Sequence, residues 1–314
     1  MNVCRFILEF ADKDTNFFVF MMFYCFFFVS LQAKHTEMIH PELRYYDFGE
    51  GVTAFSSTRR GGYSEGNYGE FNINRYCGDK PETIAQNREA LCELLEISND
   101  RLLMPHQVHL TEVVAVDEAF LNLSADEQQQ QLEGVDALMT DVGNVCIGVS
   151  TADCIPVLLY DPEHQAVCAI HAGWRGTVQR IVEVAVDKMK KVYGSQPQNI
   201  KAQIGPGISF DSFEVGDEVY EAFAKAGFEM PPISHRGTSR KFRESGISGS
   251  SGEKWHIDLP MCNRLQLEAV GVPSHQISFA SDCTFKQPDT WFSARRLGIN
   301  SGRIFTGIML KSIR

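Results

Sequence analysis

Two residues of chemically reactive type, Cys154 and His171, stand at the ends of apolar runs near the middle of the sequence. Cys154 comes just before the run 155–160, and His171 comes just after the run 166–170. Short apolar runs bounded by turn residues are typical of buried strands. If these two strands pair as a hairpin about the turn at Asp161, their outer ends meet. The thiol then lies beside the imidazole.

A cysteine beside a histidine supports two kinds of chemistry. Cys154 and His171 can act as nucleophile and base, or their sulfur and nitrogen atoms can bind a zinc-like metal. The structural alternative is a buried core thiol next to a hydrogen-bonded histidine. Strand ends are places where functional residues concentrate, so we favour a functional site.

A glycine-rich turn, residues 173–176, follows this histidine and leads into an apolar pattern of helical spacing over 177–193. The free N–H groups and the dipole at a helix N-terminus favour an anion, and Arg175 adds a charged fork. The turn therefore predicts an anion site that includes Arg175 and Gly176. The alternative is a plain strand-to-helix turn in which Arg175 is solvated.

Length and composition are ordinary for a globular enzyme, since the 314 residues are 44% hydrophobic and 22% charged. The net charge of -11 at pH 7 argues against a nucleic-acid backbone as the main partner. Nine cysteines at irregular spacing, without a CxxC motif, indicate reduced thiols and a cytoplasmic location. The oligomeric state does not follow from the sequence.

The first 37 residues differ from the remainder of the chain. Residues 17–31 form an apolar run that is shorter than the ~20 residues of a membrane span. The run resembles a signal-peptide core, but acidic residues outnumber basic ones before it, whereas a signal needs a positive start. We therefore expect a start that was assigned too early, with translation from Met38 and a single catalytic domain over 38–314. A signal or membrane anchor is the alternative.

Several other side chains are candidates for a site. Arg59, in a turn-rich loop, is either a phosphate or carboxylate binder or a surface charge. His106 and His109 are three residues apart, and in an extended chain they point opposite ways, so only one need face a site. Cys283 and the arginine pair that begins at Arg295 could line a pocket, although Cys283 also fits a core thiol.

The order of these motifs resembles the laccase-domain family (YfiH-like). That family was first labelled polyphenol oxidase and is now regarded as purine nucleoside phosphorylase. Asn72 and the segment 58–62 also match it, and the resemblance covers about 45–310. The motifs that carry it are Gln107-Val108-His109, Ala152-Asp153-Cys154, 171–176, 204–207, Asp282-Cys283-Thr284, and 292–296 with Gly302-Arg303.

The resemblance implies an α/β (α+β) fold, a layered sandwich of mixed β-sheets with flanking helices. It implies one metal, usually Zn2+ with Cu2+ possible, held by His109, Cys154 and His171. Three protein ligands with an open fourth position are the arrangement of catalytic zinc. The implied activities are phosphorolysis of adenosine, inosine and S-methyl-5'-thioadenosine, and deamination of adenosine. Purine nucleosides and phosphate are the implied partners.

These activities set requirements for other residues. Phosphorolysis needs an anion held under the ribose, and we expect Arg59, Arg175 and the N–H groups after Gly176 to hold phosphate. Deamination needs a nucleophilic water, and a zinc-bound water whose pKa is lowered toward ~7 supplies one. We expect Asp153 to move the proton, with a capping role in its loop as the alternative. The other expected substrate-binding residues are Asn72, Cys283 and Arg295.

Two other activities stay open. A cysteine hydrolase would use Cys154 and His171. A copper-dependent polyphenol oxidase needs many histidines, several of them in H-x-H pairs, and this sequence has nine histidines with none in such a pair. The usual zinc-deaminase pattern H-x-E…P-C-x-x-C is also absent, so any deamination would use a different site architecture.

Overall fold

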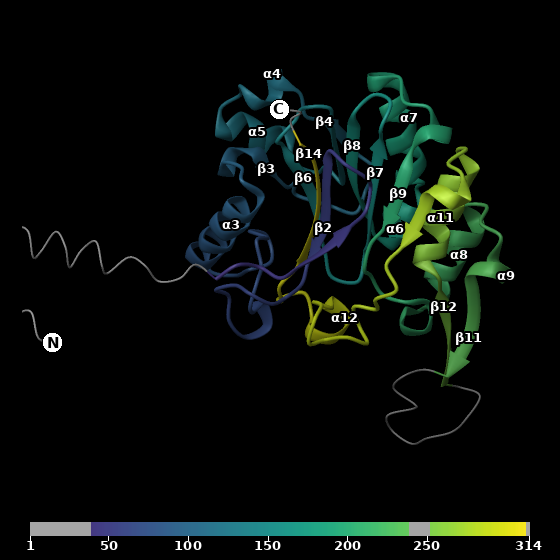
Figure 1. The fold of residues 1–314 in the computed structure, drawn as a ribbon. Helices are drawn as coiled ribbons and strands as arrows, with labels where there is room; N and C mark the ends of the chain where they lie inside the picture. Colours follow the sequence, from purple (N-terminus) through teal and green to yellow (C-terminus); the bar gives the residue numbers. More distant parts are fainter. Residues whose placement is uncertain (1–38, 239–251, 312–314) are drawn as a thin grey trace, which may run out of the picture. The chain divides into compact units, whose positions relative to one another are not determined.

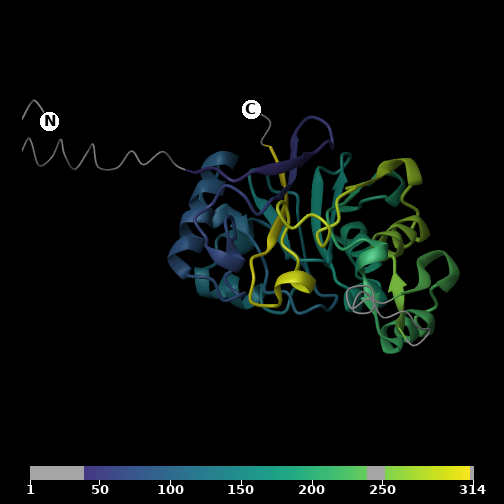
Figure 2. The same cartoon turned by 90° about the horizontal axis from the view of Figure 1, so that it is seen from below.

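Two β-sheets face each other, and helices cover their outer faces, in the computed structural model, which describes residues 39–238 and 252–311. In Figure 1 helix α3 (Pro81–Leu95) lies on one side of the sheets, and α7 (Ile181–Tyr193) and α11 (Leu259–Ala269) lie on the other. Figure 2 shows the same order of layers from below. The expected layered α/β sandwich is confirmed.

The first sheet has five strands in the order β1-β2-β14-β6-β3, and the second has six in the order β13-β9-β7-β8-β5-β4. Both sheets mix parallel and antiparallel pairs. A three-stranded sheet, β10-β12-β11, lies beside the second sheet's helices (Figure 1). The strands are β1 (Leu43–Tyr46), β2 (Val52–Ser57), β3 (Leu102–Leu103), β4 (Val113–Ala115), β5 (Ala137–Thr140), β6 (Cys146–Thr151), β7 (Ile155–Asp161), β8 (Ala166–Ala172), β9 (Lys201–Ile204), β10 (Glu214–Val215), β11 (Ser234–Thr238), β12 (Glu253–Ile257), β13 (Ile277–Phe279) and β14 (Ile304–Leu310).

Shorter helices connect these strands at the edges of the sheets. No helix among the described residues has the length and apolar character that crossing a membrane would require. The leader, residues 1–37, lies outside the described residues. The start at Met38 and the single domain over 38–314 therefore stay predictions. The shorter helices are α4 (Glu118–Leu121), α5 (Ala125–Gln131), α6 (Trp174–Val178), α8 (Asp217–Lys225), α9 (Met230–Ile233) and α12 (Ala294–Leu297).

Strand β8 shows how the sequence divides the core into two layers. Cys168 and Ile170 pack in the cluster under the helices, whereas Val167 and Ala169 pack in the cluster between the two sheets. Successive side chains of a strand point to opposite faces. His171 follows Ile170 and therefore points to the space between the sheets, at the end of the strand.

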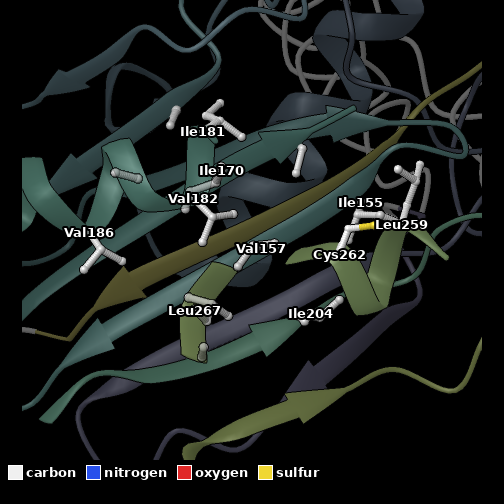
Figure 3. Close-up of a cluster of buried hydrophobic side chains, with 14 of the residues drawn as sticks. Ile155, Val157, Ile170, Ile181, Val182, Val186, Ile204, Leu259, Cys262 and Leu267 are labelled. Carbon is white, nitrogen blue, oxygen red and sulfur yellow. The ribbon is translucent and has the colours of Figure 1, made fainter. Parts of the chain in front are cut away.

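The helix-side cluster fixes the six-stranded sheet from behind. Figure 3 shows Val182 and Val186 of α7 and Leu267 of α11 gathered with Val157 and Ile204 of the sheet. All five are buried. Truncation of a buried Leu or Ile such as Leu267 or Ile204 to alanine typically costs about 2–5 kcal/mol. The strands whose ends carry the site, β7 and β8, are thus supported by a packed core.

The β7–β8 hairpin is confirmed, because the two strands pair antiparallel with Pro156 opposite His171. Cys154 directly precedes β7. The chain crosses from the five-stranded sheet to the six-stranded sheet over residues 152–154, between β6 and β7. The site therefore lies where the chain passes from one sheet to the other.

The single helix predicted over 177–193 is wrong at its N-terminal end. The structure has the five-residue helix α6, which begins at Trp174, and then a break before α7. Arg180 occupies the break with a φ of 65°. Its guanidinium lies 3.9 Å from the ring centroid of Phe228 and donates to the carbonyl of Ala226 at 2.8 Å. These contacts with a distant loop replace the continuous helix that local spacing favours.

Candidate metal centre

The structure brings the three predicted ligand side chains together. The ligand atoms of His109, Cys154 and His171 all lie within 4.8 Å of one another. The two imidazole rings meet edge to face, with centroids 4.7 Å apart. Within residues 39–238 and 252–311, no other group of three His, Cys, Asp or Glu side chains is close enough to hold a metal ion.

Asp136, at the start of β5, organises two of these ligands at once. Its Oδ1 accepts a hydrogen bond from Nδ1 of His171 at 2.7 Å, and both side chains are buried. The same carboxylate accepts the backbone N–H groups of Val108, His109 and Leu110 at 2.8–3.2 Å. A carboxylate on Nδ1 fixes the ring and leaves Nε2 for a metal. Asp136 thus orients one ligand by its ring and another by its backbone.

The turn that carries His109 depends on this carboxylate. His109 has a φ of 65°, in the left-handed region that non-glycine residues rarely adopt. A positive φ at His109 lets the three successive N–H groups point at one carboxylate. The pKa of Asp136 is held below its usual range, because these hydrogen bonds and His171 outweigh the effect of burial. A deprotonated Asp136 is therefore the state that the turn requires.

The surroundings of Cys154 lower the pKa of its thiol. Burial alone would raise its pKa, but the charge of His171 and hydrogen bonds from His109 and His171 lower it to about 6. Conversely, burial would lower the pKa of His171, whereas Cys154 and Asp136 raise it to about 9. A thiolate faces an imidazolium between these values. Metal binding exchanges that imidazolium proton for a cation.

Gly173 leaves the space that a metal needs. A Cβ atom at this position would lie 3.0 Å from Cδ2 of His109 and 3.1 Å from Sγ of Cys154. Any side chain there would press into the group of ligand atoms. Two imidazoles and one thiolate are ligands that both zinc and copper accept. The donor set and the open space at Gly173 thus fit a single metal ion.

A cavity of about 350 Å³ opens onto the three ligand side chains. Ser150 and Thr151 of β6 line one side, and loops from other parts of the chain close it. Volumes of this order are typical of small-molecule sites. The other lining residues are Asn74, Tyr76, Cys77, Pro105, His106, Gln107, Ala152, Ala294, Ile299 and Arg303, together with the three ligands.

Asp153 lies next to Cys154 in sequence, but its carboxylate is bound elsewhere. Oδ1 accepts from Oγ1 of Thr284 at 2.7 Å, and Oδ2 accepts from the backbone N–H of Arg295 at 2.7 Å. Asp153 has a φ of 87° and does not line the cavity. These contacts describe the capping role that the sequence left open as an alternative to proton transfer.

The two arginines expected to hold phosphate do not line the cavity. Arg59 donates all three guanidinium nitrogens to the backbone carbonyls of Gly69 and Pro288 and lies over the ring of Phe292. Arg175 is exposed and lies over the ring of Trp174. Arg59 therefore ties loops together, and Arg175 lies in α6 at the surface.

The remaining predicted substrate residues do not line the cavity. Asn72 is buried and accepts the backbone N–H of Arg303, which itself lines the cavity. Gly176 allows a close approach to the carbonyl of Leu110, because a Cβ there would lie 3.1 Å away. Arg295 donates to the carbonyl of Glu214.

Cys283 is buried and does not line the cavity. Its sulfur accepts the N–H of Ser209 at 3.3 Å. Burial would raise its pKa, but the hydrogen bonds that it shares with Ser209 and Ser212 hold the pKa below the usual value. The geometry gives Cys283 a structural position.

Sequence reasoning missed Asp136 and Arg303 as parts of the site. Asp136 stands at the start of an apolar run, and an acidic residue entering a buried strand is a detectable signal. In the sequence, Arg303 is recognisable only as part of the Gly302-Arg303 motif. Gln107 belongs with them, since its amide pairs with the backbone N–H and carbonyl of Ser150 and holds the His109 loop against β6.

Two similar proteins have informative names. A protein of Bacteroides thetaiotaomicron named purine nucleoside phosphorylase is 48% identical over 259 residues, which are 82% of this chain and 92% of that protein. A protein from an unknown prokaryotic organism, named adenosine deaminase RL5, is 43% identical over 273 residues, which are 86% and 99% of the two chains.

Solved structures and a family model agree with this likeness. The crystal structure of YfiH from Bacillus licheniformis has a TM-score of 0.76 at 27% identity and covers 86% of this chain and 97% of its own. YlmD from Geobacillus stearothermophilus has a TM-score of 0.75 at 28% identity and covers 88% and 99%. The model described as "Multi-copper polyphenol oxidoreductase laccase" matches residues 53–311. The chain therefore belongs to this laccase-domain family, whose members include YfiH and YlmD.

Proposed function

We propose that this chain is a zinc-dependent purine nucleoside phosphorylase that acts on adenosine, inosine and S-methyl-5'-thioadenosine and also deaminates adenosine. The observation that carries the proposal is the convergence of His109, Cys154 and His171 on one cavity. The names of the similar proteins supply the substrate class. The cavity volume of about 350 Å³ suits a nucleoside.

Phosphorolysis replaces one bond by another at the ribose. A phosphate oxygen forms a bond to C1', the bond from C1' to the purine nitrogen breaks, and its electron pair leaves with the base, which then takes up a proton. In deamination a water adds at C6 of adenine, and ammonia leaves. When bound, zinc supplies a Lewis acid and a water of lowered pKa for these steps.

The protein's own residues prepare this chemistry. Asp136 keeps Nδ1 of His171 engaged, so that Nε2 faces the cavity. The lowered pKa of Cys154 keeps its sulfur anionic at neutral pH. Gln107 holds the loop of His109 on the edge of β6. Each contact limits the movement of one ligand, and positional precision of this kind lowers the reorganisation needed during the reaction.

Zinc is our proposal for the metal, because three protein ligands with an open fourth position are typical of catalytic zinc. Copper also accepts imidazole and thiolate ligands. A multicopper oxidase would need further ligand groups, and the described residues provide this one group.

We further propose a cytoplasmic enzyme with purine nucleosides and phosphate as its partners. The seven cysteines of the described residues are all free. Free buried thiols fit a reducing compartment. The net charge of -11 argues against nucleic acid as a partner.

Product analysis tests the proposal directly. The zinc-loaded protein is incubated with adenosine or inosine, with and without phosphate, and the products are separated by chromatography. We expect free base and ribose 1-phosphate only with phosphate, and inosine from adenosine without it. Adenosine and inosine that both stay intact under every condition would contradict the proposal.

A cysteine hydrolase is the second candidate, because a thiolate beside an imidazolium also describes a nucleophile and its base. Removal of metal by a chelator separates the two functions. A metal enzyme loses activity and regains it with added zinc. A hydrolase that uses Cys154 keeps its activity in chelator and loses it only on alkylation of the thiol.

A further inference from the structure

We propose that Arg303 binds the phosphate that phosphorolysis consumes. This inference rests on the proposed function and assigns its anion to one residue. Among the lysines and arginines of the described residues, Arg303 alone lines the cavity that holds the metal ligands. The phosphate must enter that cavity, because it attacks the sugar of the nucleoside bound there.

The guanidinium of Arg303 is fixed by neutral groups. Nη1 donates to the carbonyl oxygens of Ser301 at 2.6 Å and Gly302 at 3.0 Å, and Nη2 donates to that of Ile299 at 2.8 Å. Its backbone N–H donates to the side chain of the buried Asn72. The side chain is therefore held in place before any ligand arrives.

The positive charge of Arg303 has no acidic counterpart. No carboxylate of the described residues forms an ion pair with Arg303. Its Nε donates no hydrogen bond to any of the described residues. The Nε and Nη2 edge of a guanidinium is the fork that binds phosphate through two parallel hydrogen bonds. A preorganised, uncompensated cation in a cavity attracts an anion.

The cavity wall around Arg303 offers neutral polar partners for such an anion. Asn74 and Ser150 line the cavity with it, and their side chains are joined by a hydrogen bond of 2.7 Å. Asp136, the carboxylate bonded to His171, is not in the lining, and its oxygens already accept four hydrogen bonds. An anion between Arg303 and the ligand group therefore meets no exposed carboxylate.

The test uses the zinc-loaded full-length protein and its Arg303→Gln variant. Inosine phosphorolysis is measured over a range of phosphate concentrations, and adenosine deamination is measured without phosphate. We expect the KM for phosphate to rise at least about tenfold, as the loss of a charge-assisted fork predicts. Deamination is expected to fall less than phosphorolysis, because it consumes no phosphate, and zinc content is expected to equal that of the parent, because Arg303 is not among the metal ligands.

Two more variants sharpen the result. Arg303→Lys keeps the charge but loses the fork, so its KM for phosphate is expected between those of the parent and the glutamine variant. Arg101→Gln is the matched control, because it removes an arginine that also donates to a backbone carbonyl, that of Gly143, outside the cavity. Its KM for phosphate is expected to equal that of the parent. If Arg303→Gln does not fold, the lysine variant decides the question by the same measurement.

Equilibrium binding of radiolabelled inorganic phosphate separates this inference from the proposed function. If the parent binds phosphate and Arg303→Gln and Arg303→Lys bind it more weakly, Arg303 is the anion site even when no phosphorolysis is found. A KM and a binding constant for phosphate that are unchanged in Arg303→Gln would overturn the inference. Equal loss of phosphorolysis, deamination and zinc in that variant would also overturn it, since it would show a structural role.

Discussion

Asp136 and Asp153 are two buried carboxylates near the same ligand group, and they are used in different ways. Asp153 is adjacent in sequence to Cys154, yet it binds Thr284 and the backbone of Arg295. Asp136 is far from every ligand in sequence, yet it holds the ring of His171 and the turn of His109. Sequence proximity to a ligand thus does not decide which carboxylate supports the metal.

The difference follows from the strand geometry. Asp136 enters β5, which pairs antiparallel with β8, and this pairing places it opposite the end that carries His171. Asp153 lies in the crossing between two sheets, where a positive φ turns its side chain away toward the C-terminal loops. The pairing of β5 with β8 brings Asp136 to the site, whereas the crossing between the sheets directs Asp153 away from it.

The largest effect is expected for Asp136→Asn. The amide cannot accept all of the N–H groups that converge on the carboxylate, so His109 and His171 lose their fixed positions. Zinc affinity is expected to fall by about 10–100-fold, as found for partners of metal-bound histidines. Competition with a chelating dye measures it, and an affinity within about twofold of the parent would refute the role of Asp136.

Metal affinity is expected to depend steeply on pH. A metal takes Cys154 as thiolate and His171 as neutral imidazole, whose metal-free pKa values are lowered to about 6 and raised to about 9. Between these values a proton on His171 competes with the metal, so affinity rises by about tenfold per pH unit at most. Below pH about 6 the thiol also competes, and the slope steepens. An affinity that stays constant across this range would contradict the thiolate–imidazolium pair.

Gly173→Ala tests the open space beside the ligands. Its Cβ would lie about 3.0 Å from His109 and 3.1 Å from Cys154, so the ligands must shift by a few tenths of an ångström. We expect zinc affinity to fall by about tenfold while the melting temperature changes little. Gly227→Ala is a control for the substitution itself, since nothing lies within 4 Å of the added Cβ, although its positive φ costs some stability.

The smallest effect on the metal is expected for Asp153→Asn, the matched counterpart of Asp136→Asn. Asparagine tolerates a positive φ, but it leaves one donor at Thr284 or Arg295 without an acceptor, which costs about 1–3 kcal/mol of stability. Zinc affinity should not change. Chemical denaturation measures the loss of stability, and competition with a chelating dye measures the zinc affinity. Loss of deamination alone, with zinc retained, would instead support Asp153 as the group that moves the proton.

Much of the fold and the ligand group could be predicted from the sequence. The apolar runs around Cys154 and His171 specify two buried strands, and the turn at Asp161 pairs them, so the thiol and imidazole meet. The pairing of Cys154 with His171 depends on local periodicity and on one short hairpin, which a sequence encodes directly. His109 as the third ligand came from the resemblance to the laccase-domain family and not from spacing.

The anion site could not be predicted in the same way. Arg59 lies in a promising turn, but a long-range contact with Pro288 decides where its charge points. The break at Arg180 likewise depends on Phe228, which lies in a distant loop. Such contacts join segments that are far apart in the chain, so spacing alone gives no signal for them.

The metal content of the purified protein tests the central claim most directly. Mass spectrometry of the metal in the parent, in Cys154→Ala and in Asp153→Asn compares a ligand with its neighbour. We expect about one zinc per chain in the parent and in Asp153→Asn, and almost none in Cys154→Ala, because loss of one of three protein ligands leaves an incomplete site. Zinc retained in full by Cys154→Ala would contradict a metal centre formed by His109, Cys154 and His171.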